Sequence, residues 1–269
     1  MNRLVAEQQE AIEKAEAAGG DISELRKVSL DEKARQYFKA MCDKDPKAIA
    51  LWNKFRQLSI EHYMSVYARL NIHFDQYAGE SQVQEDSMRA AEKKVSDLRL
   101  TSISDGATIV DFSKHIPGKL GEQLGIALLR KRDNTSLYLT RDLGAIFERQ
   151  QQFHFDQMIY VVAQSQELHL KQLFKLVELM DADLASKLSH VGFGLVRGMS
   201  TRKGTVVFLD DVLRDVGEKM HEVMKKNEEK YVQVIDPTKT ADILGISSVM
   251  VQDLKGKRYV ADSIGVQGF

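Results

Sequence analysis

The chain has 269 residues, 43% of them hydrophobic and 29% charged, and its 38 basic and 39 acidic side chains leave a net charge of −1. This composition is typical of a soluble globular protein with one large or two ordinary domains, and the balanced charge excludes an overall electrostatic footprint for nucleic acid. The single cysteine, Cys42, excludes a disulfide within the chain and is interpreted as a structural thiol, and without a membrane-length apolar run or a signal-type amino terminus the expected location is cytoplasmic.

The first third of the chain is predicted to be helical. One helix covers residues 4–18 and stops at Gly19-Gly20. A second begins at Ser29, which forms a capping box with Glu32, and ends near Cys42. A third opens at Asp45-Pro46. Apolar residues at helical spacing predict that one face of this third helix packs in the core: Ile49, Trp52, Phe55, Leu58, Ile60, Tyr63, Val66, Tyr67 and Leu70.

The middle of the chain mixes strands and helices. Alternation over residues 71–77 predicts a strand that ends at Gly79-Glu80-Ser81, and an amphipathic helix follows over residues 84–98. Three further segments have strand-like composition: residues 107–112, 125–131 and 135–139. Asp133-Asn134 is typical of a two-residue hairpin turn between the last two, because both residue types tolerate positive φ. A helix is predicted to start at Arg141.

The last part alternates strand and helix. Residues 158–163 form a continuous apolar run, as expected of a strand covered on both faces. A helix over 166–180, a buried strand over 191–196 and helices over 210–230 and 240–252 follow, the first of these two with Val212, Leu213, Val216, Met220 and Val223 on one side. This order predicts an α/β fold with a largely parallel sheet.

Several polar residues follow predicted strands, where ligands bind in open α/β sheets. Glu80 follows the 71–77 strand, Tyr138 and Asp142 straddle the end of the 135–139 strand, and Gln166 follows the 158–163 strand. Each has a structural alternative. Asp142 sits where a helix N-cap carboxylate would, Tyr138 suits a half-buried strand position, Gln166 suits a cap or a solvated site, and Glu80 suits the exposed surface.

The loop after the 191–196 strand is the strongest candidate for binding a ligand. Residues 198–205 read GMSTRKGT, so small residues surround Ser200, Thr201, Arg202 and Lys203. Small residues let the backbone approach a ligand closely, and hydroxyls with adjacent cations suit a polyphosphate. The alternative from composition alone is a solvated basic hairpin turn. His190, before the loop, fits either a structural role or an adenosine contact, and His169 fits either a helix surface or a nucleotide contact.

Long stretches of the chain resemble the cytoplasmic, eukaryotic-type arginyl-tRNA synthetases. Residues 198–204 are similar to the family's form of the class I Lys-Met-Ser-Lys-Ser loop. Family-like segments also include residues 67–72 (YARLNI), 79–81 (GES), 135–142 (TSLYLTRD), 155–163 (FDQMIYVVA), 219–228 (KMHEVMKKNE) and 241–247 (ADILGIS). The resemblance is nearly continuous from about Lys33 to Arg258.

The resemblance implies L-arginine, ATP and tRNA(Arg) as substrates. In that family Tyr138, Asp142, Gln166 and Glu80 correspond to contacts with L-arginine, and carboxylates suit a guanidinium because its rigid fork of donors matches them. The loop residues Ser200, Thr201, Arg202 and Lys203 would bind the β- and γ-phosphates of ATP and stabilise the departing pyrophosphate, with Mg²⁺ sharing that work. The predicted ATP contacts are His190, Met199, Ser200, Arg202 and Lys203.

The chain also departs from the family. The upstream His-Ile-Gly-His-type motif and the following anticodon-binding helical domain are not found, and residues 259–269 no longer resemble the family. Asn134 stands where glycine is usual, and Gln164-Ser165 replaces Ser-Gln. We therefore expect a helical insertion over 1–70, the second half of a Rossmann-like catalytic domain over 71–258, and a non-family tail over 259–269.

Two functional hypotheses follow from these departures. The first is an arginine–tRNA ligase catalytic fragment that alone gives little or no aminoacylation. The alternative is a non-catalytic nucleotide- or partner-binding module derived from the synthetase, which retains a partial nucleotide site or pairs with another polypeptide that supplies the missing half.

Overall fold

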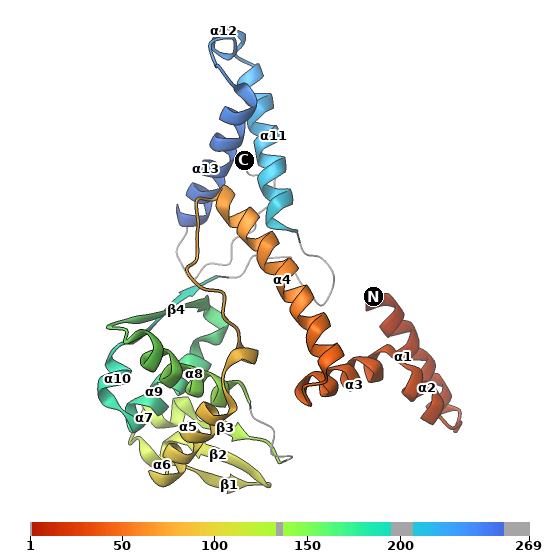
Figure 1. Ribbon diagram of the computed structural model, residues 1–269, viewed down its shortest axis with the longest axis vertical. Helices are drawn as coiled ribbons and strands as arrows, with labels where there is room; N and C mark the ends of the chain where they lie inside the picture. The colour runs from red at the N-terminus through yellow and green to blue at the C-terminus, as the bar shows by residue number, and fades with distance from the viewer. Residues whose placement is uncertain (1, 133–136, 195–206, 256–269) are drawn as a thin grey trace. The chain divides into compact units, whose positions relative to one another are not determined.

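A computed structural model describes residues 2–132, 137–194 and 207–255 of the chain (Figure 1). These residues divide into two compact units, one formed by residues 2–75 with 207–255 and the other by 76–132 with 137–194. The predicted phosphate loop, with Met199, Ser200, Thr201, Arg202 and Lys203, lies outside the described residues, as does the predicted turn at Asp133-Asn134. No helix in the described ranges is both long and apolar enough to cross a bilayer.

The first unit begins with the predicted helices. They are α1 (Asn2–Ala17), α2 (Ser23–Val28), α3 (Leu30–Cys42) and α4 (Pro46–Arg69). The predicted cap at Ser29 is present, since its Oγ accepts from the Glu32 amide at 3.2 Å, and the helix that opens at Asp45-Pro46 is capped by Asp45 Oδ1, which accepts from the Lys47 and Ala48 amides. Each satisfies amides that the first helical turn cannot pair internally.

The predicted buried face of α4 is wrong. Of its nine apolar positions only Val66 is buried, and Phe55 is 59% exposed. Leu58 and Tyr63 are also exposed. Helical spacing identifies residues on one side of a helix but not whether a neighbouring element covers them, which is why the prediction failed.

The predicted strand over residues 71–77 is also absent from the structure, which has no strand there. Asn71 takes a left-handed φ of 56°, and the Ile72 amide donates to Tyr67 O at 3.0 Å. Phe74 then packs edge-on against Tyr67, with ring centroids 5.2 Å apart. The alternating pattern therefore marks a chain that folds back on the end of α4.

The carboxyl-terminal helices of this unit are α11 (Leu209–Lys225), α12 (Glu228–Tyr231) and α13 (Pro237–Lys255), and α11 and α13 run side by side (Figure 1). The helix predicted over 210–230 is broken at Asn227, whose side chain accepts from the Lys230 amide and caps α12. Of the apolar residues predicted for one side of this helix, Val212, Leu213 and Val216 are buried, whereas Val223 is 48% exposed. Arg69 ties α4 to α13 through Asp242 Oδ1 at 2.7 Å.

The second unit contains a three-stranded antiparallel sheet, β1 (Ser102–Ser104), β2 (Ala107–Asp111) and β3 (Ile126–Arg130), in that order. It is preceded by η1 (Glu80–Gln82) and α5 (Glu85–Asp97), and α6 (Phe112–His115) and α7 (Lys119–Leu124) connect β2 to β3. The predicted helix over 84–98 and the strands over 107–112 and 125–131 are confirmed, with ends shifted by one or two residues.

A parallel strand pair forms the other sheet. β4 (Met158–Ala163) pairs with β5 (Leu188–Phe193), and Ala163 lies opposite Phe193. The prediction that both faces of β4 are covered is wrong for the described residues, because Ile159 and Val161 are 51% and 64% exposed. Three helical elements connect the two strands: η2 (Gln164–Gln166), α9 (Glu167–Met180) and α10 (Ala182–Ser186).

The predicted strand over 135–139 is wrong at its described end. Tyr138 and Leu139 are the first residues of α8 (Tyr138–Phe153), and the Arg141 amide already donates to Leu137 O at 3.2 Å. Buried Thr140 donates its hydroxyl to Leu129 O, which fixes this first turn on β3. The hydrogen bond from Thr140 to β3 stabilises the start of the helix, and this tertiary contact outweighs the strand-like composition of residues 135–139.

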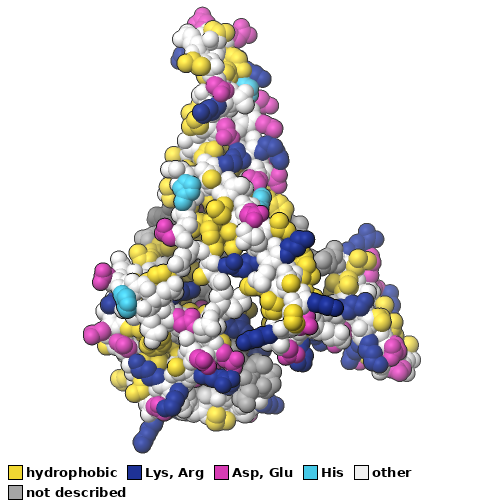
Figure 2. Space-filling model, viewed as in Figure 1, with side chains coloured by type: hydrophobic (Ala, Val, Ile, Leu, Met, Phe, Trp, Pro, Cys, Tyr) yellow, Lys and Arg dark blue, Asp and Glu magenta, His cyan; other side chains and the backbone are white. Residues whose placement is uncertain are grey.

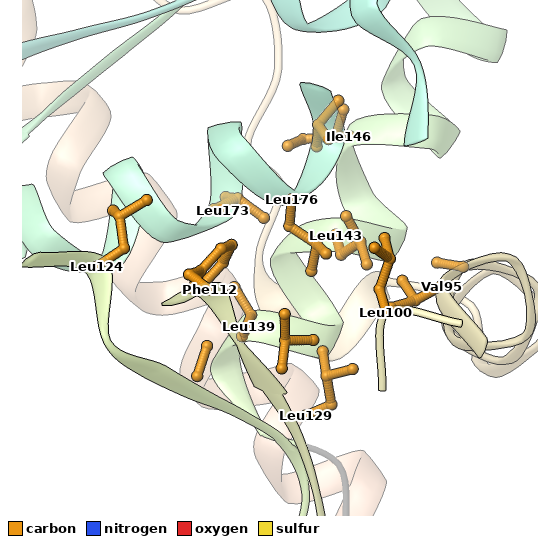
Figure 3. Packing of buried hydrophobic residues seen from close by; sticks show 14 of the residues in the cluster. Val95, Leu100, Phe112, Leu124, Leu129, Leu139, Leu143, Ile146, Leu173 and Leu176 are labelled. Atoms are coloured by element: carbon orange, nitrogen blue, oxygen red, sulfur yellow. The ribbon is translucent and has the colours of Figure 1, made fainter. Parts of the chain in front are cut away.

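The core of the second unit lies between α8, α9 and the antiparallel sheet. Figure 3 shows Leu143 and Ile146 of α8 near Leu173 and Leu176 of α9. Phe112 and Leu129 come from the sheet side, and all six side chains are essentially inaccessible to solvent. Each fully buried side chain of this size contributes about 1.5–3 kcal/mol. This packing sets the amino-terminal ends of α8 and α9, where the candidate site residues lie.

Candidate functional site

The candidate site is built around Asp142, on the second turn of α8. Its Oδ2 lies 2.6 Å from Nε2 of His169, which is in the first turn of α9. Asp142 is 31% exposed and His169 27%. The N-cap position of α8 belongs to Leu137, so Asp142 does not cap this helix and the capping alternative is wrong. The carboxylate instead joins two helices at a half-buried point open to solvent.

Tyr138 lies one helical turn before Asp142, on the same side of α8. Its side chain is 65% exposed, so the alternative of a half-buried strand aromatic is wrong. Thr140 between them is fully buried and anchors the turn to β3. The backbone is therefore fixed from the core side while Tyr138 and Asp142 remain accessible to a ligand.

Glu80 reaches the same helix start from η1. Its Oε2 lies 3.5 Å from Nη1 of Arg141, the residue before Asp142. Both side chains are partly exposed, so the pair is held weakly. A guanidinium of the chain itself thus lies beside a carboxylate that the sequence predicts for a guanidinium substrate.

Gln166 immediately precedes α9, three residues before His169. It occupies the N-cap position of α9, but its side chain makes no cap hydrogen bond and is exposed, so of the two structural alternatives the solvated one describes it. Gln166 therefore lies at the amino-terminal end of α9, the same end that carries His169, the partner of Asp142.

The carboxyl ends of β4 and β5 lie side by side, because Ala163 pairs with Phe193. Gln164 extends from β4 across to Gly192 of β5, where an added Cβ would come 2.1 Å from its Oε1. The amide of Gln164 also donates to Glu167, and a hydrogen bond from Lys171 lowers the pKa of Glu167. The predicted phosphate loop begins a few residues beyond this edge.

His190 of β5 makes a hydrogen bond to the neighbouring strand β4. Its Nε2 lies 3.2 Å from Val162 O, so the ring donates across the strand pair. That contact fulfils the structural alternative, and the adenosine contact stays a prediction.

Tyr160 of β4 is partly buried, and its hydroxyl is shielded from solvent. Burial raises its pKa to about 12, the charge of Arg149 opposes that rise, and the charge of Asp142 adds to it. A weak hydrogen bond from Arg149 also opposes the rise, but the hydroxyl has no hydrogen bond of normal geometry among the described residues.

Sequence reasoning missed four contributors: the bond from His169 to Asp142, and the roles of Arg141, Gln164 and Tyr160. A signal existed for His169, which lies three residues after Gln166 on the same helix face. For Arg141 and Gln164 the partners lie 61 and 28 residues away in the chain, and no local pattern indicates them.

Charge on the visible face of the molecule is mixed. In Figure 2, basic and acidic side chains alternate over the described residues. Many are neighbours on one helix, such as Arg89 with Glu85 and Lys93 with Asp97. The described residues on this face therefore form no broad patch of a single charge.

Comparison with known proteins gives one consistent result. The family described as "tRNA synthetases class I (R), catalytic domain" matches residues 6–264. The cytoplasmic arginine–tRNA ligase of Saccharomyces cerevisiae is 51% identical over 230 residues, which cover 86% of this chain and 37% of that protein. The probable cytoplasmic arginine–tRNA ligase of Schizosaccharomyces pombe is 45% identical over 260 residues, covering 96% and 41%. The chain thus spans about two fifths of the length of these relatives.

A solved structure agrees in fold. The arginyl-tRNA synthetase of Plasmodium falciparum aligns with a TM-score of 0.72 at 22% identity, over 92% of this chain and 41% of that one.

Proposed function

The chain belongs to the class I arginyl-tRNA synthetase family, and from that premise we propose that the amino-terminal ends of α8 and α9 form its L-arginine pocket. The proposal is carried by Asp142, a carboxylate that caps no helix and is held by His169 at a half-buried, open point. A carboxylate placed in this way suits a guanidinium, which is planar, permanently charged and a donor only.

Each predicted substrate residue has a role in this proposal. Asp142 and Glu80 accept from the guanidinium, Tyr138 covers its edge, and Gln166 orients the ligand through its amide. The exposure of Tyr138 and Gln166 supports this arrangement, since both side chains are free to meet a ligand. Two acceptor groups around one delocalised cation favour arginine over lysine through geometry, because an ammonium cannot present a planar fork.

The proposed reaction follows from the family. The arginine carboxylate attacks the α-phosphate of ATP, pyrophosphate leaves and arginyl-adenylate forms. A ribose hydroxyl of tRNA(Arg) then attacks the arginyl carbonyl, and AMP leaves. Ser200, Thr201, Arg202 and Lys203 stabilise the charge that develops on the pyrophosphate, and His190 and Met199 lie beside the nucleotide. The order of the chain supports this, because residues 198–205 follow β5, whose carboxyl end pairs with that of β4.

Magnesium would act with the phosphates in this proposal. Within the described ranges no three His, Cys, Asp or Glu side chains come together as a protein-held metal site would need. In this proposal Mg²⁺ would bind phosphate oxygens of ATP and neutralise part of their charge.

Three further assignments are part of the proposal. We retain residues 1–70 as the helical insertion, 71–258 as catalytic-domain sequence and 259–269 as a carboxyl-terminal tail, with the family match ending at residue 264 inside that tail. A cytoplasmic location is proposed from the names of the relatives. The half-exposed outer face of β4 supports a requirement for further polypeptide before the full reaction can proceed, because parallel strands are normally covered on both faces.

Calorimetric titration of the 269-residue chain with L-arginine tests the pocket. Wild type should bind, Asp142→Asn should weaken binding by at least about tenfold because it removes the charge, and Asp156→Asn, at an exposed carboxylate before β4, should match wild type. Failure of the wild-type chain to bind L-arginine would overturn the proposal.

Arginine-dependent ATP–pyrophosphate exchange with tRNA separates the two functional candidates. Binding without exchange is expected of the chain alone, and exchange restored by added polypeptide containing the upstream half identifies a ligase fragment. Nucleotide or partner binding with no response to L-arginine would favour the non-catalytic module.

A further inference from the structure

We propose that His169 is a positioning residue for L-arginine, whose Nε2 proton holds the Asp142 carboxylate in the orientation that receives the substrate guanidinium. This inference rests on the proposed L-arginine pocket and assigns a role to a side chain outside the predicted substrate contacts. His169 acts through Asp142 and has no direct contact with substrate in this proposal.

The geometry fixes which atom carries the proton. An ionised carboxylate can only accept, so at an Nε2 to Oδ2 distance of 2.6 Å the imidazole is the donor. The two residues come from different helices and are 27 positions apart, so the bond is not a product of local helix spacing. Both side chains are about one third exposed or less, which shields the bond from competing water.

The bond leaves most of the carboxylate available. A carboxylate offers about four lone-pair positions on two oxygens, and His169 uses one of them. Asp142 Oδ1 makes no hydrogen bond to the residues that the structure describes. A guanidinium can therefore approach the rest of the carboxylate while His169 prevents rotation about the Asp142 side-chain torsions, which would otherwise be frozen only on binding.

The neighbouring side chains favour a role for His169 in orienting Asp142 over a role as a competitor of L-arginine for that carboxylate. Arg141 is engaged with Glu80, so His169 is the donor that meets Asp142 among the described side chains. A competitor that simply fills the place of the substrate would predict the opposite sign, since its removal would strengthen arginine binding.

The test is calorimetric titration of the 269-residue chain with L-arginine in four histidine variants. His169→Ala should raise the dissociation constant about three- to tenfold, because the carboxylate loses its only described donor. His169→Gln should restore binding to within about twofold, because its amide nitrogen can replace Nε2. His169→Asn, an equally polar but shorter amide, should behave like His169→Ala.

His221→Ala is the matched control. His221 is also helical and half-buried, and its Nε2 lies 2.8 Å from Tyr231 Oη in the other unit. It should bind L-arginine like wild type. If His169→Ala fails to fold, as judged by thermal unfolding, the comparison of His169→Gln with His169→Asn carries the test alone.

The outcomes distinguish this inference from the function on which it rests. If Asp142→Asn abolishes binding while His169→Ala and His169→Asn match wild type, His169 has no positioning role and the pocket stands. Tighter binding by His169→Ala overturns the inference in favour of a competitor. A wild-type chain that does not bind L-arginine overturns the pocket and this inference together.

Discussion

Gly245 of α13 lies so close to Gly217 of α11 that a Cβ built on Gly245 would come within 2.9 Å of the Gly217 amide nitrogen and 3.0 Å of its Cα. The contact is not symmetrical. A Cβ built on Gly217 would meet nothing closer than Asp242 Oδ1 at 3.5 Å, an ordinary van der Waals distance. The backbones of the two helices thus touch at a point that requires glycine on one side only.

Alanine at the two positions should change stability in opposite directions. Gly245→Ala should lower the free energy of unfolding by about 1–3 kcal/mol, because backbone must move to admit the methyl group. Gly217→Ala should raise it by up to about 1 kcal/mol, through helix propensity with space available. Urea unfolding followed by circular dichroism measures both. A stabilising Gly245→Ala would show that α11 and α13 do not approach this closely.

Thr140 gives a second stability prediction. Thr140→Val keeps the shape of the side chain but leaves Leu129 O without its hydroxyl donor in a buried position. The free energy of unfolding should fall by about 1–2 kcal/mol. Thr101→Val is the control: its hydroxyl makes only a 3.5 Å exposed contact with Ser96, so it should change stability by less than about 0.5 kcal/mol. Equal effects would remove the argument that Thr140 anchors α8.

Prediction from the sequence succeeded for elements whose own residues determine their structure. These are the cap at Ser29, the helix start at Asp45-Pro46, the strand over residues 158–163 and the helix α9. Prediction failed where the burial or conformation of a segment depends on packing against distant parts of the chain. Apolar spacing in α4 could not reveal that Phe55 has no cover, and strand-like composition at Tyr138 lost to a helix start that Thr140 anchors on a distant strand.

The sequence was enough to predict which residues belong to the candidate site, but not how they are placed relative to one another. The resemblance supplied Tyr138, Asp142 and Gln166, and the structure brings them to the ends of two adjoining helices. Their predicted placement at strand ends holds for Gln166 alone. The Asp142–His169 bond depends on the packing of α8 against α9, and side chains 27 residues apart give no periodic sign of it.

Tyr160 should make stability fall at alkaline pH. Its pKa is about 12 in the folded chain, against about 10 when unfolded, because burial disfavours the phenolate. Between these values the unfolded state releases the proton and the folded state keeps it, so unfolding becomes easier as pH rises. The contribution is present below pH 10 and amounts to about 2 kcal/mol lost by pH 12.

Tyr160→Phe isolates this effect. At pH 7 the variant should be as stable as wild type or slightly more so, because the hydroxyl has no partner among the described residues. Above pH 10 its advantage should grow by about 1.4 kcal/mol per pH unit until the native phenol titrates. Urea midpoints from pH 7 to 11.5 measure the difference. A constant difference across that range would mean that the phenol is not shielded from water.

The pair of Glu80 and Arg141 makes a final prediction about substrate affinity. Arg141 places a guanidinium 3.5 Å from the carboxylate that we propose for the substrate, so it competes for Glu80. Arg141→Met should therefore strengthen L-arginine binding, by up to about fivefold, because an exposed pair of this kind is worth at most about 1 kcal/mol. Arg214→Met is the control, since Arg214 pairs with Asp211 and Asp215 in the other unit.

Glu80→Gln should weaken L-arginine binding by itself, and it should cancel the gain in affinity when it is combined with Arg141→Met. If Arg141→Met weakens binding instead, the ion pair supports the pocket as it stands, and Glu80 is not an acceptor for the substrate.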